Sequence, residues 1–215
     1  MPITKTKFWG NNHQLAVWLI KESIDELQAM LGASHVCPPE ITHEAKRAEW
    51  LAARVCIKYL CENMGISFNG VDKDENGKPL LINQANSELS ISHSYPYVAA
   101  IISTRHTVGI DIEQVRDKLL KLAPRFLSEE ELTQTNNEAE RICLYWSAKE
   151  SLFKYYSKGN VTFKKQLLIA PFDFAEQGIM HGEIRMPDVN KIVELEYEVK
   201  DGYVLCYTTP CPTSL

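Results

Sequence analysis

The sequence lacks the long apolar runs that mark membrane proteins. Its longest apolar stretches, such as residues 15–20, are far shorter than the roughly 20 apolar residues that a transmembrane helix needs. The segment from Met1 to Lys5 also has none of the parts of a secretory signal peptide. We therefore expect a cytoplasmic protein that does not bind membranes.

The cysteines lack any pattern that would indicate a disulfide framework or a zinc site. They form no Cys-x-x-Cys pair and do not have the spacing of zinc ligands. We expect reduced thiols, as in cytosolic proteins, at all six positions. These are Cys37, Cys56, Cys61, Cys143, Cys206 and Cys211.

An excess of positive charge is missing as well. The formal net charge is −5 at pH 7, which argues against a nucleic-acid partner, so any anionic ligand must be held by a local basic cluster. No low-complexity segment divides the chain. Its 215 residues suffice for one large domain or for two tightly packed halves, in either case with a substantial core.

The apolar periodicity predicts an α+β protein. Ser23 with Glu26, and Ser128 with Glu131, are capping-box patterns that open helices. Longer helices are expected from Pro38 to Gly65 and over about 138–158, the latter ending at a Lys158-Gly159 cap, with a short helix at about 116–123. Strands are expected over 15–20, 89–92, 97–103, 108–113, 191–199 and 203–209, before a proline-rich tail.

A faint internal echo suggests two related halves. Four residues of the first long helix recur 96 residues later in the second. Trp50, Ala52, Lys58 and Tyr59 correspond to Trp146, Ala148, Lys154 and Tyr155.

Asp111 and Glu113 are candidate metal ligands. Two residues apart on a strand, they project from one face, where two carboxylates repel each other unless a cation lies between them. Carboxylate oxygens without a nearby histidine suit Mg²⁺. A solvated strand face is the alternative explanation.

The second long helix carries another candidate pair. Glu150 and Lys154 are one turn apart, which is also the spacing of an ordinary surface ion pair. Trp146 lies one turn before Glu150, and an aromatic ring beside a charged pair favours a helix that faces a partly buried site.

Basic residues gather in the first half of the chain. Arg47 and Arg54 are nearly two helical turns apart and share a face, which Lys58 extends; they could form a phosphate clamp or a solvated helix face. Lys78 follows a glycine in a Gly-Lys-Pro turn, and His93 follows Ser92 at the end of a strand. Each of these two can also be purely structural.

Taken in order, these pieces resemble the 4′-phosphopantetheinyl transferase superfamily, in particular its larger Sfp-type members. The order is R-x6-R on a helix, then G-K-P, S-I-S-H-S, G-I-D-I-E, F-L-S-E-E-E and W-S-A-K-E-S-L-F-K, over roughly residues 44–159. The most diagnostic pieces are Gly109–Glu113 and Trp146–Lys154.

The resemblance implies roles for these residues. Asp111, Glu113 and Glu150 would bind Mg²⁺, with Mn²⁺ as a possible substitute, and Glu150 and Lys154 would act in catalysis. The remaining ligands of coenzyme A would be Arg47, Arg54, Lys78, Ser92, His93 and Lys149, together with Lys154. The implied fold has two similar α+β halves, residues 1–107 with the nucleotide-side residues and 108–215 with the metal and catalytic residues. They would be related by a pseudo-twofold axis, with coenzyme A in the cleft between them.

The activity that the resemblance implies is transfer of phosphopantetheine from coenzyme A to a serine of an apo acyl- or peptidyl-carrier protein. The enzyme would be monomeric and of the holo-acyl-carrier-protein synthase type. Two alternatives stay open: a Mg²⁺-dependent nucleotide pyrophosphate hydrolase, and a binding module for coenzyme A or carrier proteins without catalysis. The sequence does not indicate which carrier or pathway is served.

One segment fits the carrier protein as a partner. Carrier proteins of this class are generally acidic around the modified serine, and residues 116–126 offer four basic side chains among apolar ones. The basic residues are Arg116, Lys118, Lys121 and Arg125. An ordinary amphipathic helix would show the same pattern.

Overall fold

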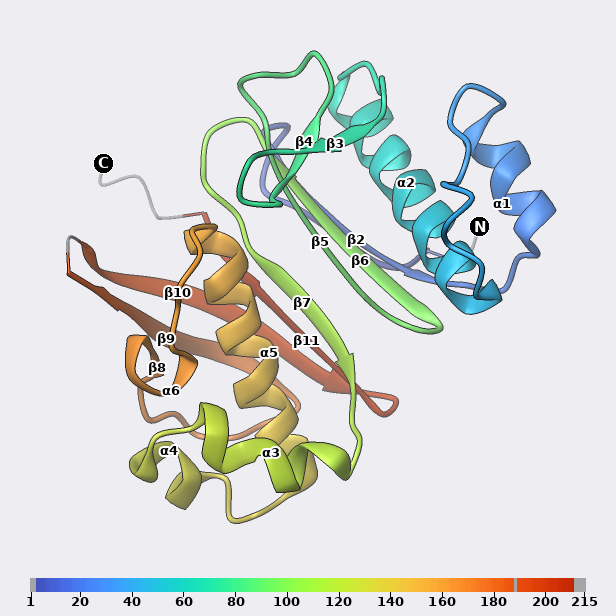
Figure 1. Ribbon diagram of the computed structural model, residues 1–215. Helices are drawn as coiled ribbons and strands as arrows, with labels where there is room; N and C mark the ends of the chain where they lie inside the picture. Colours follow the sequence, from blue (N-terminus) through green and yellow to red (C-terminus); the bar gives the residue numbers. More distant parts are fainter. Residues whose placement is uncertain (1–2, 188, 211–215) are drawn as a thin grey trace. The chain divides into compact units, whose positions relative to one another are not determined.

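The computed structural model describes residues 3–187 and 189–210, which form two compact units, Met1–Val108 and Gly109–Leu215 (Figure 1). Both units combine helices with antiparallel strands, so the predicted α+β class is confirmed. No helix in the described part of the chain is long and apolar enough to cross a membrane. The pseudo-twofold axis and the coenzyme A cleft stay predictions.

The first unit is a four-stranded sheet with strand order β1-β2-β6-β5, and helix α2 packs against one face of it. Helix α1 packs on α2, and β3 and β4 form a separate hairpin. The bounds are β1 Ile3–Phe8, β2 His13–Leu19, α1 Ile24–Leu31, α2 Glu44–Met64, β3 Val71–Lys73, β4 Pro79–Leu81, β5 Glu88–Ser94 and β6 Tyr97–Ser103.

Alternate side chains of the two central strands, β2 and β6, point to the same face of the sheet and form the core of this unit. Ala16 and Trp18 of β2, with Val98 and Ala100 of β6, face helix α2 and are at most 1 % exposed. The helix meets them with residues such as Leu51. The strand predicted at 15–20 is confirmed as β2, which begins two residues earlier and ends at Leu19.

The second unit is a five-stranded antiparallel sheet with strand order β7-β11-β10-β9-β8. Helix α5 lies along it, and α3, α4 and α6 flank that helix (Figure 1). The bounds are β7 Ile110–Gln114, α3 Lys118–Phe126, α4 Glu129–Gln134, α5 Ala139–Tyr156, α6 Phe163–Gln166, β8 Leu167–Ile169, β9 Gln177–Met186, β10 Val189–Lys200 and β11 Tyr203–Thr208.

Two glycines let α5 approach the sheet closely. A Cβ atom at Gly109 would lie 2.0 Å from the carbonyl oxygen of Ser151, and one at Gly182 would lie 2.5 Å from the side chain of Leu152. Real Cβ atoms do not come this near, and the helix backbone cannot yield as a flexible side chain can. The glycine that opens the G-I-D-I-E segment therefore allows strand β7 to start directly against α5.

The capping boxes at Ser23 and Ser128 are confirmed, but both long helices have other bounds than predicted. Helix α2 begins at Glu44 after the N-cap His43, because Pro38 first enters a turn in which Ile41 N–H donates to its carbonyl. Helix α5 ends at Tyr156, and its C-cap is the left-handed Ser157 rather than Gly159. The end of the proline-rich tail and Cys211 lie outside the described residues.

Candidate active site

The Asp-x-Glu pair lies on strand β7, on the face that α5 covers. The strand register sets Asp111 opposite Cys206 and Glu113 opposite Val204, and both of these partners belong to the core under α5. Asp111 is 5 % exposed. The two carboxylates thus leave the same face of the strand, which excludes the solvated strand face for Asp111.

Lys154 of α5 reaches this strand. Its Nζ lies 2.8 Å from Asp111 Oδ1 and donates a second hydrogen bond of 3.0 Å to the carbonyl oxygen of Ile110. The side chains of Lys154 and Asp111 are 24 % and 8 % exposed. The helical spacing had suggested an exposed ion pair between Lys154 and Glu150. Lys154 instead pairs with Asp111, and this ion pair is largely shielded from water.

Glu150 lies one turn before Lys154 and is electrostatically coupled to the same strand. Burial raises the pKa of its carboxyl to about 7; the negative charges of Asp111 and Glu113 add to this rise, and the ammonium of Lys154 opposes it. Three carboxylates and one ammonium therefore form a single charge cluster within the second unit.

The donor chemistry of this cluster fits a divalent cation. Carboxylate oxygens are the ligands that Mg²⁺ and Mn²⁺ prefer, and a cation would offset the repulsion by Asp111 and Glu113 that adds to the effect of burial on the pKa of Glu150. Within residues 3–187 and 189–210, however, no three His, Cys, Asp or Glu side chains are already arranged as a metal-binding group. Ligation by Asp111, Glu113 and Glu150 stays a prediction.

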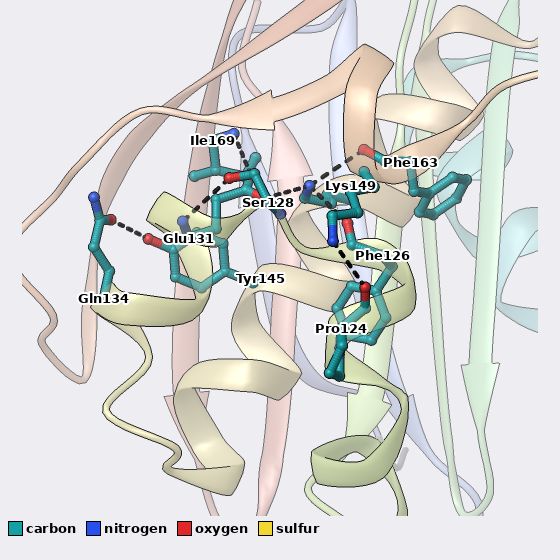
Figure 2. Close-up of polar contacts among 10 residues, drawn as sticks. Pro124, Phe126, Ser128, Glu131, Gln134, Tyr145, Lys149, Phe163 and Ile169 are labelled. Carbon is teal, nitrogen blue, oxygen red and sulfur yellow. Dashed lines mark hydrogen bonds and ion pairs between the residues drawn. The ribbon is translucent and has the colours of Figure 1, made fainter.

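Lys149, next to Glu150 in sequence, lies in the interior of the same unit. It is completely buried, and its Nζ donates to Glu131 Oε2 at 2.7 Å and to the carbonyl oxygens of Phe126 and Phe163 at 2.9 and 3.2 Å (Figure 2). Glu131 also accepts from the backbone N–H groups of Ser128 and Ile169. These contacts join α5 to the end of α3, to α4, to α6 and to β8, and the predicted contact of Lys149 with coenzyme A remains a prediction.

Trp146, about one turn before Lys149 in helix α5, contacts the same two residues, Phe126 and Phe163. Its ring packs edge-on against Phe126, with ring centroids 4.9 Å apart, and stacks on Phe163 at 5.7 Å. Trp146 and Lys149 of the W-x-x-K motif therefore both contact Phe126 and Phe163 and hold them against helix α5. Glu150 is the next residue of this helix after Lys149.

The basic residues of α2, in the first unit, differ in their surroundings. Arg47 is exposed, whereas Arg54 is half-buried and stacks on Trp50, with the guanidinium carbon 3.5 Å from the ring centroid. Burial lowers the pKa of Arg54 to about 10, so it stays charged at neutral pH. Lys58 donates to the carbonyl oxygen of Met30 at the end of α1 and holds the two helices together.

The other predicted ligands in the first unit lie on or near β5. Lys78 pairs with Glu88. Ser92 and His93 are neighbours on the strand and point to opposite faces: Ser92 is 7 % exposed, whereas the side chain of His93 is 43 % exposed and lies on the α2 side, 3.2 Å from Glu49. The strand thus separates two residues that the sequence pattern grouped.

Two carboxylates of these sites were missed in the sequence. Glu131 was recognised only as the third residue of a capping box, and Glu49 was not singled out, although it interrupts the apolar stripe of α2 between Ala48 and Leu51. An acidic residue on a buried helix face is a signal for a charged partner. It does not identify that partner, which here comes from a distant strand.

Several known proteins are similar in sequence to this chain. A family model described as the 4′-phosphopantetheinyl transferase superfamily matches residues 107–208. The chain is 33% identical over 109 residues to the 4′-phosphopantetheinyl transferase gsp of Aneurinibacillus migulanus, covering 47% of this chain and 45% of that protein. It is 29% identical over 147 residues to the 4′-phosphopantetheinyl transferase Sfp of Bacillus subtilis, covering 64% and 62%.

A further relative, a 4′-phosphopantetheinyl transferase of Bacillus subtilis, is 29% identical over 160 residues, covering 72% of this chain and 67% of that protein. The chain thus spans less than two thirds of the length of the first two relatives. The resemblance predicted from the motifs is confirmed.

Proposed function

Because residues 107–208 match the model of the 4′-phosphopantetheinyl transferase superfamily, we propose that this chain moves the phosphopantetheine arm of coenzyme A onto a serine of an apo acyl- or peptidyl-carrier protein. The observation that carries the proposal is the shielded cluster of Asp111, Glu150 and Lys154, which lies within the matched region. An ion pair with only a structural role would not require a third, destabilised carboxylate beside it.

The reaction that this cluster suits is phosphoryl transfer. The serine hydroxyl oxygen forms a bond to the β-phosphorus of coenzyme A, and the bond from that phosphorus to the bridging oxygen breaks. Adenosine 3′,5′-bisphosphate leaves with the bridging oxygen and its electron pair. A divalent cation bound by Asp111, Glu113 and Glu150 would supply neutralisation of the pyrophosphate charge.

The residues of the chain would divide the proton and charge transfers. Glu150, whose pKa burial raises to about 7, accepts the serine proton directly or through a water. Lys154 stabilises or protonates the departing oxygen. Arg47, Arg54, Lys78 and His93 supply positive or donor groups for the nucleotide end, and we retain Ser92 and Lys149 as weaker candidates because both are buried.

The test is intact-mass spectrometry of several apo carrier proteins incubated with coenzyme A, Mg²⁺ and this protein. We expect one carrier to gain the mass of one phosphopantetheine group. Excess chelator and Asp111→Ala should each abolish the gain, whereas Glu140→Gln, on the exposed start of the same helix, should not.

The products separate this proposal from its alternatives. Phosphopantetheine released to water without a modified carrier would indicate a hydrolase, and binding without any product would indicate a module without catalysis. Full transfer in excess chelator would contradict the metal assignment alone.

A further inference from the structure

A buried carboxylate of α2 lies directly behind the histidine of S-I-S-H-S. Glu49 is 2 % exposed, and its Oε2 lies 3.2 Å from Nδ1 of His93. The imidazole is the outer member of this pair, since its side chain is 43 % exposed. Nδ1 therefore faces the protein, and Nε2, across the ring, is the nitrogen left for a ligand.

Glu49 is held firmly enough to orient another group. Its Oε1 accepts a hydrogen bond of 3.0 Å from the backbone N–H of Tyr95, and its Oε2 accepts one of 2.7 Å from Lys46 Nζ. The carboxylate thereby joins helix α2 to the turn that follows β5. Such a carboxylate cannot swing away to water, because the fold fixes it on both sides.

Glu49 is also charged at neutral pH. Burial alone would raise the pKa of its carboxyl, but the hydrogen bonds and positive charges of His93 and Lys46 outweigh burial and lower the pKa to about 2. A carboxylate that only accepts hydrogen bonds requires a proton on the nitrogen that faces it. Nδ1 of His93 must then be the protonated nitrogen whenever the pair is formed.

We propose that Glu49 is a positioning residue: it accepts the Nδ1–H of His93 and fixes the ring, so that in the imidazolium form Nε2–H points outward as a donor to an anionic oxygen of coenzyme A. Carboxylates orient histidines that bind metals or act in catalysis in the same way. The hydrogen bond at one ring nitrogen fixes the ring orientation and the protonation of that nitrogen, and thereby determines how the other nitrogen can bind. The inference rests on the proposed function for its ligand, but the orientation of the ring does not depend on that function.

The first measurement needs no ligand. In Glu49→Gln the side chain keeps its shape, but its amide can donate to Nδ1 as well as accept from it. Long-range ¹H–¹⁵N spectra of the free, folded protein should show His93 with a proton on Nδ1 in the wild type and a loss of that preference in Glu49→Gln. An unchanged ring in the variant would overturn the proposal, whether or not coenzyme A binds.

The second measurement is the dissociation constant for coenzyme A by calorimetry. We expect Glu49→Gln to raise it about tenfold, the scale of one weakened charge-assisted hydrogen bond. The matched control is Glu44→Gln, which removes an exposed negative charge from the same helix and should change the constant less than about twofold. In a His93→Ala background, Glu49→Gln should have almost no further effect, because the positioned group is gone.

The measurement in the His93→Ala background distinguishes a positioning role of Glu49 from a purely structural one. An equal tenfold rise with and without His93 would overturn the proposal, and so would a His93→Ala variant that binds coenzyme A normally. Carrier modification by the wild type, followed in parallel by intact mass, keeps these outcomes apart from failure of the transferase function itself.

Discussion

One turn of helix α5 carries Glu150 and Lys154, and both are tied electrostatically to Asp111 on the neighbouring strand. The wild-type sequence thus places a carboxyl with a pKa of about 7 and a fixed ammonium around one anionic group. Either residue alone would be common on a helix surface. Because both interact with Asp111, substitutions of the two can test whether they act together in catalysis.

Glu150→Gln keeps the side-chain shape but removes the charge and the proton acceptor. We expect the turnover number to fall at least about a hundredfold, the usual scale for positioned acid–base help. Lys154→Ala should also lower turnover, and Lys154→Arg should recover little, because a guanidinium is bulkier and a poor proton donor. Single-turnover transfer followed by intact mass measures this, with thermal melts to confirm folding. Near-normal rates in both folded variants would contradict the catalytic assignment.

His13 gives a pH dependence that is separate from catalysis. It is 2 % exposed, and neither ring nitrogen has a hydrogen-bond partner within the described residues. Burial, with a smaller contribution from the charge of His106, lowers its pKa to about 4. Below its ordinary pKa of about 6.5 the unfolded chain takes up the proton first, so this contribution to stability is lost as the pH falls from 6.5 towards 4.

We therefore expect His13→Leu to be less sensitive to acid than the wild type over this range. Urea unfolding at several pH values between 7 and 4 measures the difference, and His43→Ala, at an exposed position, serves as the control. An equally steep loss of stability in His13→Leu would show that other groups cause it.

The motif letters predicted the kind of chemistry at these positions, but not which side chains are available for it. Lys149 and Glu150 are adjacent in W-S-A-K-E, yet a helix turns them about 100° apart, so that Lys149 enters the core while Glu150 interacts electrostatically with Asp111. The partner that buries Lys149 is Glu131, in another helix. No local pattern contains that information.

The Lys149–Glu131 pair is a property of several elements, because its contacts join α3, α4, α5, α6 and β8 (Figure 2). Removing one partner leaves a buried charge without compensation, which typically costs about 3–5 kcal/mol. We expect Lys149→Met and Glu131→Gln each to destabilise the protein on this scale. Urea unfolding should show that the double variant loses less than the sum of the two, because the partners interact directly.

Lys165→Met is the matched control, since Lys165 is exposed in the adjacent helix α6. Its effect should stay within about 0.5 kcal/mol. Strict additivity of the two buried substitutions would show that they do not act as a pair.

Element types were predicted more reliably than element ends. The strands at 97–103 and 203–209 appear as β6 and β11 because their β-prone runs are also the buried ones. The C-cap of α5 was misplaced because Ser157 adopts the left-handed conformation that glycine usually supplies. Strand β1 was missed, since its alternation of Ile3, Lys5 and Lys7 with threonines gives little apolar contrast.

The order of strands in each sheet lies beyond local patterns. Strand β2 pairs with β6, more than seventy residues later, and β11 pairs with β7 across an even longer separation. Such pairings depend on which faces can be buried together. Hydrophobic periodicity identifies a strand and its buried face but leaves its neighbours undetermined.

The net charge of the whole chain bears on how a carrier protein would be attracted. The chain is acidic, but α3 exposes Lys118, Lys121 and Arg125, while Leu119 and Phe126 pack in the core. The amphipathic helix considered as an alternative is thus present, and its outer face is basic. This is compatible with docking of an acidic partner, which stays a prediction.

Charge reversal at Lys121 and Arg125 should raise the Michaelis constant for an acidic carrier and leave coenzyme A binding unchanged. The effect should be greatest at low salt, where screening is least. Reversal of Lys158 and Lys200, which are also exposed, is the control for net charge. Unchanged carrier kinetics at low salt would place the docking surface elsewhere.

Burial of the cysteines limits thiol–disulfide exchange with coenzyme A, the proposed substrate. All five described cysteines are buried, and burial raises the pKa of Cys56 and Cys61 to about 12 and that of Cys143 and Cys206 further. Thiol–disulfide exchange needs a thiolate that solvent can reach. These four thiols are therefore poor partners for a mixed disulfide with coenzyme A, so oxidised cofactor would not inactivate the folded protein through them.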